Sequence, residues 1–189
     1  MQTAVPLQLE HARFIRSLRS VRRFAPTPIP DAVLRDVLDI ARWTGSSKNT
    51  QPWELIVVRE RDRLRALAAC GTFASHLAGA AVGLVLVMDD EQRRLDEGRL
   101  AQNVMLAAWA YGIGSCIGTL QPDDNVERAR ALLGVPAGRG LRTALSLGYP
   151  ADERALRRSL EPGASGVPIG RKPMKDFVSW ERFGQRQPG

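Results

Sequence analysis

Apolar and polar positions along the chain alternate between helical and strand-like patterns. Apolar side chains recur every three or four residues over residues 9–18 and again from Asp31 to a stop near Gly45, which predicts two amphipathic helices. The Ala/Leu/Met-rich stretch 91–111 predicts one long, buried helix. A short helix is expected over 125–133, because the glycine and proline that follow it are typical of a helix end.

Three short β-branched runs predict strands at residues 54–59, 82–88 and 141–149. The second run, VGLVLVM, is apolar on both faces, which is typical of a central strand. We expect a helix between the first two strands. The Gly-interrupted segment 112–120 (GIGSCIGTL) has the pattern of a strand with bulges.

The length of 189 residues predicts a single domain, 1–189, and 44% hydrophobic with 25% charged residues is a globular composition. No apolar run approaches the roughly 20 residues that span a bilayer, and no export signal is evident, so we expect a cytoplasmic protein. Two cysteines and two histidines are too few for a disulfide framework or a familiar zinc cluster. We therefore predict no metal.

The net charge of +7 lies at the two ends of the sequence. Residues 1–29 carry five arginines and one acid, residues 151–189 carry eight basic and five acidic side chains, and the middle is balanced. No stretch interleaves lysine with aromatic residues, as a single-strand-binding surface does. This pattern favours local anion sites over a nucleic-acid-binding domain, which stays as a minor alternative.

Two polar segments carry candidate binding chemistry. Residues 19–24 (RSVRRF) offer guanidinium groups and a hydroxyl that could bind a phosphate. A solvated basic helix end without a ligand would have the same sequence pattern. Residues 45–53 (GSSKNTQPW) are dense in donors and acceptors suited to the edge of a heterocycle, although a capping turn is the alternative.

Two further segments give weaker signals. The glycines of 112–120 would let the backbone approach a planar ligand, but the segment fits neither a Rossmann fingerprint nor a P-loop. Cys116 within it is interpreted as an inert buried thiol, and neither His11 nor His76 receives a role. Residues 170–175 (GRKPMK) could close over a phosphate or form a solvated tail.

Taken in order, these segments resemble the FMN-dependent nitroreductase family. The resemblance covers nearly the whole chain and rests on RSVRRF (19–24), SSKNTQPW (46–53), QNVMLAA (102–108), GIGSCIG (112–118) and RKPMKDFVSWERFG (171–184). The pattern S-S-x-N-x-Q-P-W is the most specific of these.

The resemblance implies an α+β fold, with a mostly antiparallel sheet flanked by helices, in an intertwined homodimer. Its C-terminal extension, here 161–189, would wrap the partner subunit. Each of two FMN sites would lie at the subunit interface, with the Ser-Asn loop supplied by the other chain. The cofactor-binding residues implied are Arg19, Ser20, Arg22, Ser46, Ser47, Asn49, Gly118, Thr119 and Arg171.

The activity implied is transfer of hydride from NADH or NADPH, through flavin N5, to an electron-poor acceptor such as a nitroaromatic or a quinone, by a ping-pong mechanism without a catalytic side chain. The alternative is a flavin-binding protein for storage or sensing. Two positions depart from the family pattern: Leu18 and Ile169 stand where members often carry a basic residue. Weaker retention of FMN, or a different flavin-like ligand, would follow from this loss.

Overall fold

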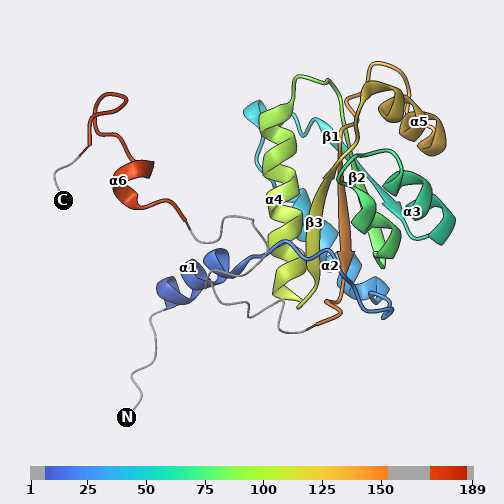
Figure 1. The fold of residues 1–189 in the computed structure, drawn as a ribbon, viewed down its shortest axis with the longest axis horizontal. Helices are drawn as coiled ribbons and strands as arrows, with labels where there is room; N and C mark the ends of the chain where they lie inside the picture. Colours follow the sequence, from blue (N-terminus) through green and yellow to red (C-terminus); the bar gives the residue numbers. More distant parts are fainter. Residues whose placement is uncertain (1–6, 153–170, 187–189) are drawn as a thin grey trace, which may run out of the picture. The chain divides into compact units, whose positions relative to one another are not determined.

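The computed structural model describes residues 7–152 and 171–186 (Figure 1). Its contacts divide the chain into two compact units, Met1–Leu156 and Arg157–Gly189. The second unit contains the short helix α6 (Met174–Phe177), and its large apolar side chains Phe177 and Phe183 are exposed.

A four-stranded antiparallel sheet forms the centre of the first unit. Its strands are β1 (Trp53–Val58), β2 (Val82–Met88), β3 (Gly114–Thr119) and β4 (Thr143–Gly148), in the order β1-β2-β4-β3. The prediction of a central strand is confirmed, because every residue of β2 is buried. The predicted bulges are wrong: β3 pairs with β4 in unbroken register along its whole length. Because the pairing with β4 is regular, the β3 backbone is also regular on the edge that faces away from β4.

Helices precede, separate and follow these strands, as the apolar periodicity predicts. They are α1 (Leu7–Ser17), α2 (Asp31–Arg42), α3 (Arg61–Ala68), α4 (Arg94–Ala110) and α5 (Asp123–Leu133), with short 3₁₀ turns η1 (Ser47–Asn49) and η2 (Ser75–Gly79). The long helix begins later than expected because the Asp90 carboxylate accepts a hydrogen bond from the backbone N–H of Gln92 at 2.8 Å and closes a turn. α5 ends where Gly134 adopts a left-handed φ of 68°.

The helices cover both faces of the sheet, so the fold has three layers (Figure 1). Leu84 and Leu86 of β2 pack into a core with α2 and α4, whereas Val85 and Val87 pack into a second core with α3 and α5. Alternate residues of a strand point to opposite faces, and full burial of each such side chain contributes about 1.5–3 kcal/mol. The α+β fold with a flanked antiparallel sheet is thereby confirmed.

The first helix is present as predicted, but its apolar face is uncovered. Leu9 is 52% exposed and Ile15 is 59% exposed. The end of the helix is held to α4, since Trp109 Nε1 donates a hydrogen bond to Ser17 Oγ at 2.8 Å. α1 therefore presents an anchored apolar face to its surroundings.

Candidate functional site

The outer edge of β3 is the place where the first predicted segment meets the sheet. Ser20 forms a parallel bridge with Ser115, and the backbone N–H of Val21 donates to the Ser115 carbonyl at 2.9 Å. This close approach requires Gly114, because a Cβ there would lie 2.6 Å from the Cβ of Val21. Further along, Ile117 is 46% exposed. Beyond Thr119, whose carbonyl lies against Gly71, the edge is paired again through the bridge between Gln121 and Gly71. We call the residues between the two bridges, Ile117–Thr119, the free edge of β3.

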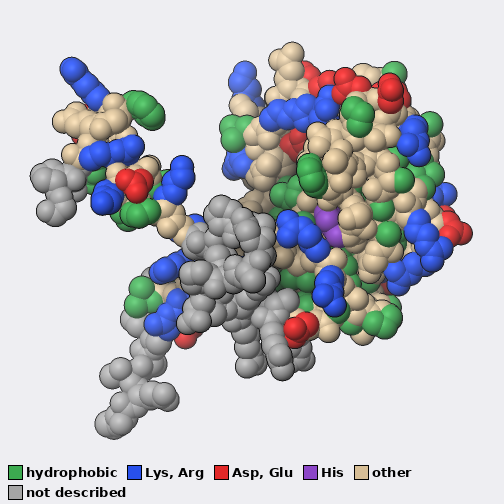
Figure 2. Space-filling model, in the orientation of Figure 1, with side chains coloured by type: hydrophobic (Ala, Val, Ile, Leu, Met, Phe, Trp, Pro, Cys, Tyr) green, Lys and Arg blue, Asp and Glu red, His purple; other side chains and the backbone are tan. Residues whose placement is uncertain are grey.

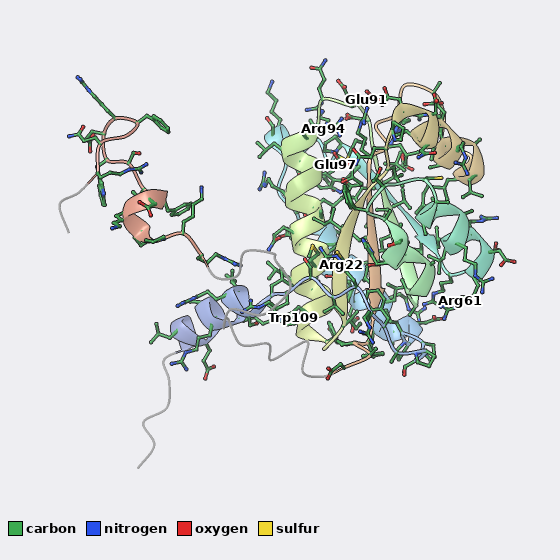
Figure 3. The ribbon with its side chains drawn as sticks, viewed as in Figure 1. Arg22, Arg61, Glu91, Arg94, Glu97 and Trp109 are labelled. Atoms are coloured by element: carbon green, nitrogen blue, oxygen red, sulfur yellow. The ribbon has the colours of Figure 1, made fainter. Side chains whose placement is uncertain are left out.

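Arg22 brings a cation to the strand next to the free edge (Figure 3). The side chains of Ser20 and Arg22 lie close enough to the Cys116 thiol to favour its ionised form. Burial outweighs both and raises the pKa of Cys116 above its ordinary value. The interpretation of Cys116 as a buried, inert thiol therefore agrees with the structure, and the guanidinium beside it is the chemically significant group.

The side chains of the two arginines in the R-S-x-R pattern, Arg19 and Arg22, contact different parts of the chain. Arg19 turns back on α1, where its Nη1 donates hydrogen bonds to the carbonyls of Arg16 at 2.8 Å and Leu18 at 2.9 Å. Arg16 lies in the last turn of α1 and Leu18 follows the helix, and carbonyls at a helix C-terminus have no hydrogen-bond donor within the helix. Arg19 is only partly exposed in this position. In this chain Arg22, and not Arg19, is the arginine at β3.

Packing within the chain accounts for the glycines of 112–120 at two positions. Gly114 accommodates Val21, and a Cβ on Gly118 would lie 3.2 Å from the Cβ of Ala74 and 3.4 Å from Cε1 of His76. Both glycines therefore let side chains of the same chain approach the strand. Approach of a planar ligand to this backbone remains a prediction.

The Ser-Asn loop is a backbone turn under strain. Ser46 Oγ accepts a hydrogen bond from the backbone N–H of Gln51 at 2.8 Å, which closes the loop. Lys48, Asn49 and Gln51 have positive φ angles of 52°, 55° and 46°, a conformation that costs energy in residues other than glycine. Such strain occurs preferentially at binding sites, so it favours the binding interpretation of the loop over a capping turn, and binding here stays a prediction.

The loop and the first segment lie at different points along α4. The residue preceding the loop is held to the middle of the helix, because Asn103 Nδ2 donates to Thr44 Oγ1 at 2.8 Å. Ser17, two residues before the first segment, is held near the helix end by Trp109. At about 1.5 Å per residue, these two anchors are roughly 9 Å apart along the helix axis.

The structure therefore brings together only some of the predicted site residues. Ser20, Arg22, Gly118 and Thr119 meet at β3, and Arg19 lies at the end of α1. The Ser-Asn group, Ser46, Ser47 and Asn49, lies beside the middle of α4. Arg171 belongs to the second unit, and Ile169 lies outside the described residues.

His76, which received no role in the sequence analysis, lies beside the candidate site at β3. It lies in η2, is 7% exposed, and its Nδ1 is 2.7 Å from Ser146 Oγ on β4. Burial and, next, the positive charge of Arg22 lower the pKa of His76 below its ordinary value, and the backbone of Ile117 partly offsets this. Seventy residues separate the two partners, so no local motif could have indicated the pair.

The lowered pKa of His76 predicts a loss of stability in mild acid. The unfolded chain takes up a proton near the ordinary value of 6.5, whereas the folded chain takes it up only at lower pH. The free energy of unfolding should therefore fall as pH drops through about 6.5 towards the folded value. Urea denaturation at several pH values would measure this, and His76→Asn should flatten the slope. An unchanged slope in that variant would contradict a neutral, buried His76.

A separate cavity lies away from the free edge of β3. It has a volume of about 210 Å³ and is lined by Pro26, Pro28, Ile29, Arg59, Arg61, Ala81 and Val82. Arg59 Nη1 is 2.6 Å from the Asp31 carboxylate, and Arg61 Nη1 donates to the Ala80 carbonyl at 2.9 Å. Figure 3 shows Arg61 apart from Arg22. Because both guanidiniums are already engaged, the cavity is not assigned to the site.

Basic side chains form separate groups on the visible face of the molecule, with acidic side chains between some of them (Figure 2). Several arginines are paired, for example Arg139 with Glu54 at 2.7 Å and Arg142 with Asp123 at 2.8 Å. Within residues 7–152 and 171–186, no group of three potential metal ligands occurs and no helix is long and apolar enough to cross a membrane. These features leave the free edge of β3 and the Ser-Asn loop as the candidate site.

Comparison of the sequence with known proteins gives a consistent result. A sequence model described as the nitroreductase family matches residues 15–95. An NADH dehydrogenase of Thermus thermophilus is 30% identical, in an alignment that covers 86% of this chain and 91% of the relative. Nitroreductase NfnB of Mycolicibacterium smegmatis is 28% identical, with 90% of this chain and 92% of the relative covered.

Solved structures show the same fold. An FMN-dependent nitroreductase from Clostridium difficile matches with a TM-score of 0.74 at 23% identity, covering 90% of this chain and 98% of its own. An NADPH:FMN oxidoreductase from Vibrio harveyi, solved in complex with NAD⁺, matches with a TM-score of 0.75 at 22% identity, covering 93% and 79%. At these identities the likeness establishes the arrangement of helices and strands.

Proposed function

This chain belongs to the nitroreductase family of NAD(P)H-dependent flavin oxidoreductases, and we propose that it binds FMN and passes hydride from NADH or NADPH to an electron-poor acceptor. The acceptor class would be nitroaromatics or quinones, reduced in a ping-pong sequence in which both substrates use one site. Relatives named for FMN and for NAD(P)H support this assignment.

The observation that carries the proposal is the position of Arg22 beside the free edge of β3. A guanidinium next to an exposed strand edge suits a planar ring that gains negative charge on reduction. In a strand, the N–H and C=O groups of alternate residues point to opposite edges. The Ser115 carbonyl accepts a hydrogen bond from Val21 on the outer edge, so the backbone groups of the odd-numbered residues of β3 point away from β4. Ile117 and Thr119 share that orientation, so their N–H groups face outward.

Bound FMN would supply the hydride-carrying chemistry. The chain's own residues would bind and orient the cofactor. The family resemblance gives Arg22 to the phosphate and ribityl chain, but its position at β3 leads us to propose that it stabilises negative charge on the ring, while the outward N–H groups of the free edge donate hydrogen bonds. Ser20 and Arg19 would contribute to the phosphate and ribityl end. No side chain is assigned a proton-transfer role, in line with the expectation from sequence.

A homodimer would complete each site. We expect a second copy of the chain to supply Ser46, Ser47 and Asn49 to the site at Arg22, as the family resemblance implies; within one chain the Ser-Asn loop and the end of α1 are held at different turns of α4. The exposed Leu9 and Ile15 of α1 give the dimer an apolar face to bury. In this proposal the chain is one domain, its extension 161–189 packs on the partner subunit, and Arg171 reaches the phosphate.

The visible absorbance spectrum of the purified protein tests the function directly. We expect a flavin spectrum, either on purification or after addition of FMN, that bleaches with anaerobic NADPH or NADH and returns when a quinone is added. A protein that binds FMN but is not reduced by either nucleotide would favour the storage or sensing alternative. A protein that takes up no FMN would overturn the proposal and draw attention to Leu18 and Ile169.

A further inference from the structure

His76 lies directly behind the strand that carries the free edge. The 3₁₀ turn η2, which contains it, contacts both β3 and β4. The imidazole is nearly enclosed, at 7% exposure, and its Nδ1 lies 2.7 Å from Ser146 Oγ, which is itself fully buried. This hydrogen bond fixes the ring against the sheet.

The imidazole of His76 lies near two alternate positions on β3, Cys116 and Gly118. Ser146 is the cross-strand partner of Cys116, and its Oγ also lies 3.4 Å from the Cys116 carbonyl. Cε1 of the same ring would be 3.4 Å from a Cβ placed on Gly118. His76 therefore occupies the space beside Gly118 that a side chain there would need, and it is linked through Ser146 to the Cys116 carbonyl.

The imidazole is a costly residue for a purely structural role. Its Nε2 is buried, and beyond Ser146 the ring has the backbone of Ile117 as a neighbouring acceptor, at a geometry too poor for a full hydrogen bond. An unsatisfied buried polar atom destabilises a protein, and an apolar side chain of the same size would fill the space without that cost. The ring lies against the strand where the flavin is proposed to bind, and the charge of Arg22 is near enough to act on it, which offers a functional reason for an imidazole here.

We propose that His76 is a positioning residue of the flavin site, which, through Ser146 and its position beside Gly118, holds the free edge of β3 in place against the isoalloxazine ring. The inference rests on the proposed function. Displacement of this edge would misalign the outward N–H groups of Ile117 and Thr119, whose hydrogen bonds to the ring differ in strength between its oxidised and reduced forms. Loss of the support should therefore change both the affinity for FMN and the reduction potential of the bound flavin.

The test compares the full-length wild-type protein with His76→Phe, His76→Asn and Ser146→Ala. Phenylalanine keeps the ring and loses the hydrogen bond, whereas asparagine can place an amide where Nδ1 lies. We expect His76→Phe and Ser146→Ala to weaken FMN binding about tenfold and His76→Asn to remain within about threefold of wild type. We also expect a shift on the order of 30 mV in the two-electron potential, which corresponds to a tenfold difference between oxidised and reduced flavin.

Leu77→Ala is the matched control. Leu77 is the next residue of the same turn and is fully buried, so its truncation should lower the melting temperature while leaving FMN affinity and potential at wild-type values. If His76→Phe does not fold, Ser146→Ala removes the same hydrogen bond and decides the question. Wild-type affinity and potential in the folded variants would overturn the role of His76. Failure of the wild-type protein to bind FMN would instead overturn the proposed function.

Discussion

Replacement of Arg22 by alanine should weaken FMN binding about 10- to 100-fold, because a charge-assisted hydrogen bond contributes roughly 1.5–3 kcal/mol. Arg22 is the arginine that lies beside β3, next to the thiol of Cys116 and the ring of His76. The loss should be larger for the reduced cofactor, which carries more negative charge. Quenching of free FMN fluorescence on titration with protein measures the affinity, and a spectroelectrochemical titration measures the difference between redox forms.

Arg23→Ala is the matched control for this substitution. It removes the same charge one residue further along the chain, from a side chain that is exposed like that of Arg22. Arg23→Ala should leave FMN affinity within about twofold of wild type, since exposed charges contribute little at a distance. Arg19→Ala should have an intermediate effect, because its guanidinium must leave the carbonyls of Arg16 and Leu18 to reach a phosphate. Equal losses for Arg22→Ala and Arg23→Ala would show that only net charge matters.

The sequence predicted the layered fold because the apolar periodicity is strong and local. The all-apolar run of β2 could lie only in the middle of a sheet covered on both faces, and the structure places it there. The bulges expected in 112–120 were wrong for a physical reason. Glycine in a strand marks either a bulge or a close neighbour, and here the neighbours are Val21 and Ala74, which come from distant parts of the sequence.

The candidate site was predicted less completely than the fold. Residue types indicated anion binding at 19–24, but they could not show that Arg22 faces β3 while Arg19 faces the end of α1. The strained φ angles of Lys48 and Asn49 were also not readable from side-chain chemistry. His76 was missed because its partner Ser146 becomes a neighbour only when η2 packs on the sheet. Each of these features depends on tertiary contacts between segments that are far apart in sequence.

Replacement of Ile15 by glutamate should convert the protein to a monomer and abolish FMN binding together. Ile15 is 59% exposed on α1, so the substitution should change the stability of the isolated chain by no more than about 0.5 kcal/mol. In a dimer that buries this face, an unpaired carboxylate would be strongly unfavourable, with a loss of association of roughly 2–4 kcal/mol or more. Cofactor binding should fail at the same time if the Ser-Asn loop comes from the other chain. Sedimentation equilibrium and FMN fluorescence on the same sample measure both quantities.

Ile40→Glu on α2 is the control for this experiment, because Ile40 has a similar exposure of 45% and lies on a helix whose opposite face packs in the core. It should remain dimeric and bind FMN. Deletion of residues 161–189 provides a second route to the same result, since an extension that packs on the partner subunit would add its own contacts to the dimer. A flavin-loaded monomer, obtained by either the Ile15→Glu substitution or the deletion, would show that one chain holds a complete site.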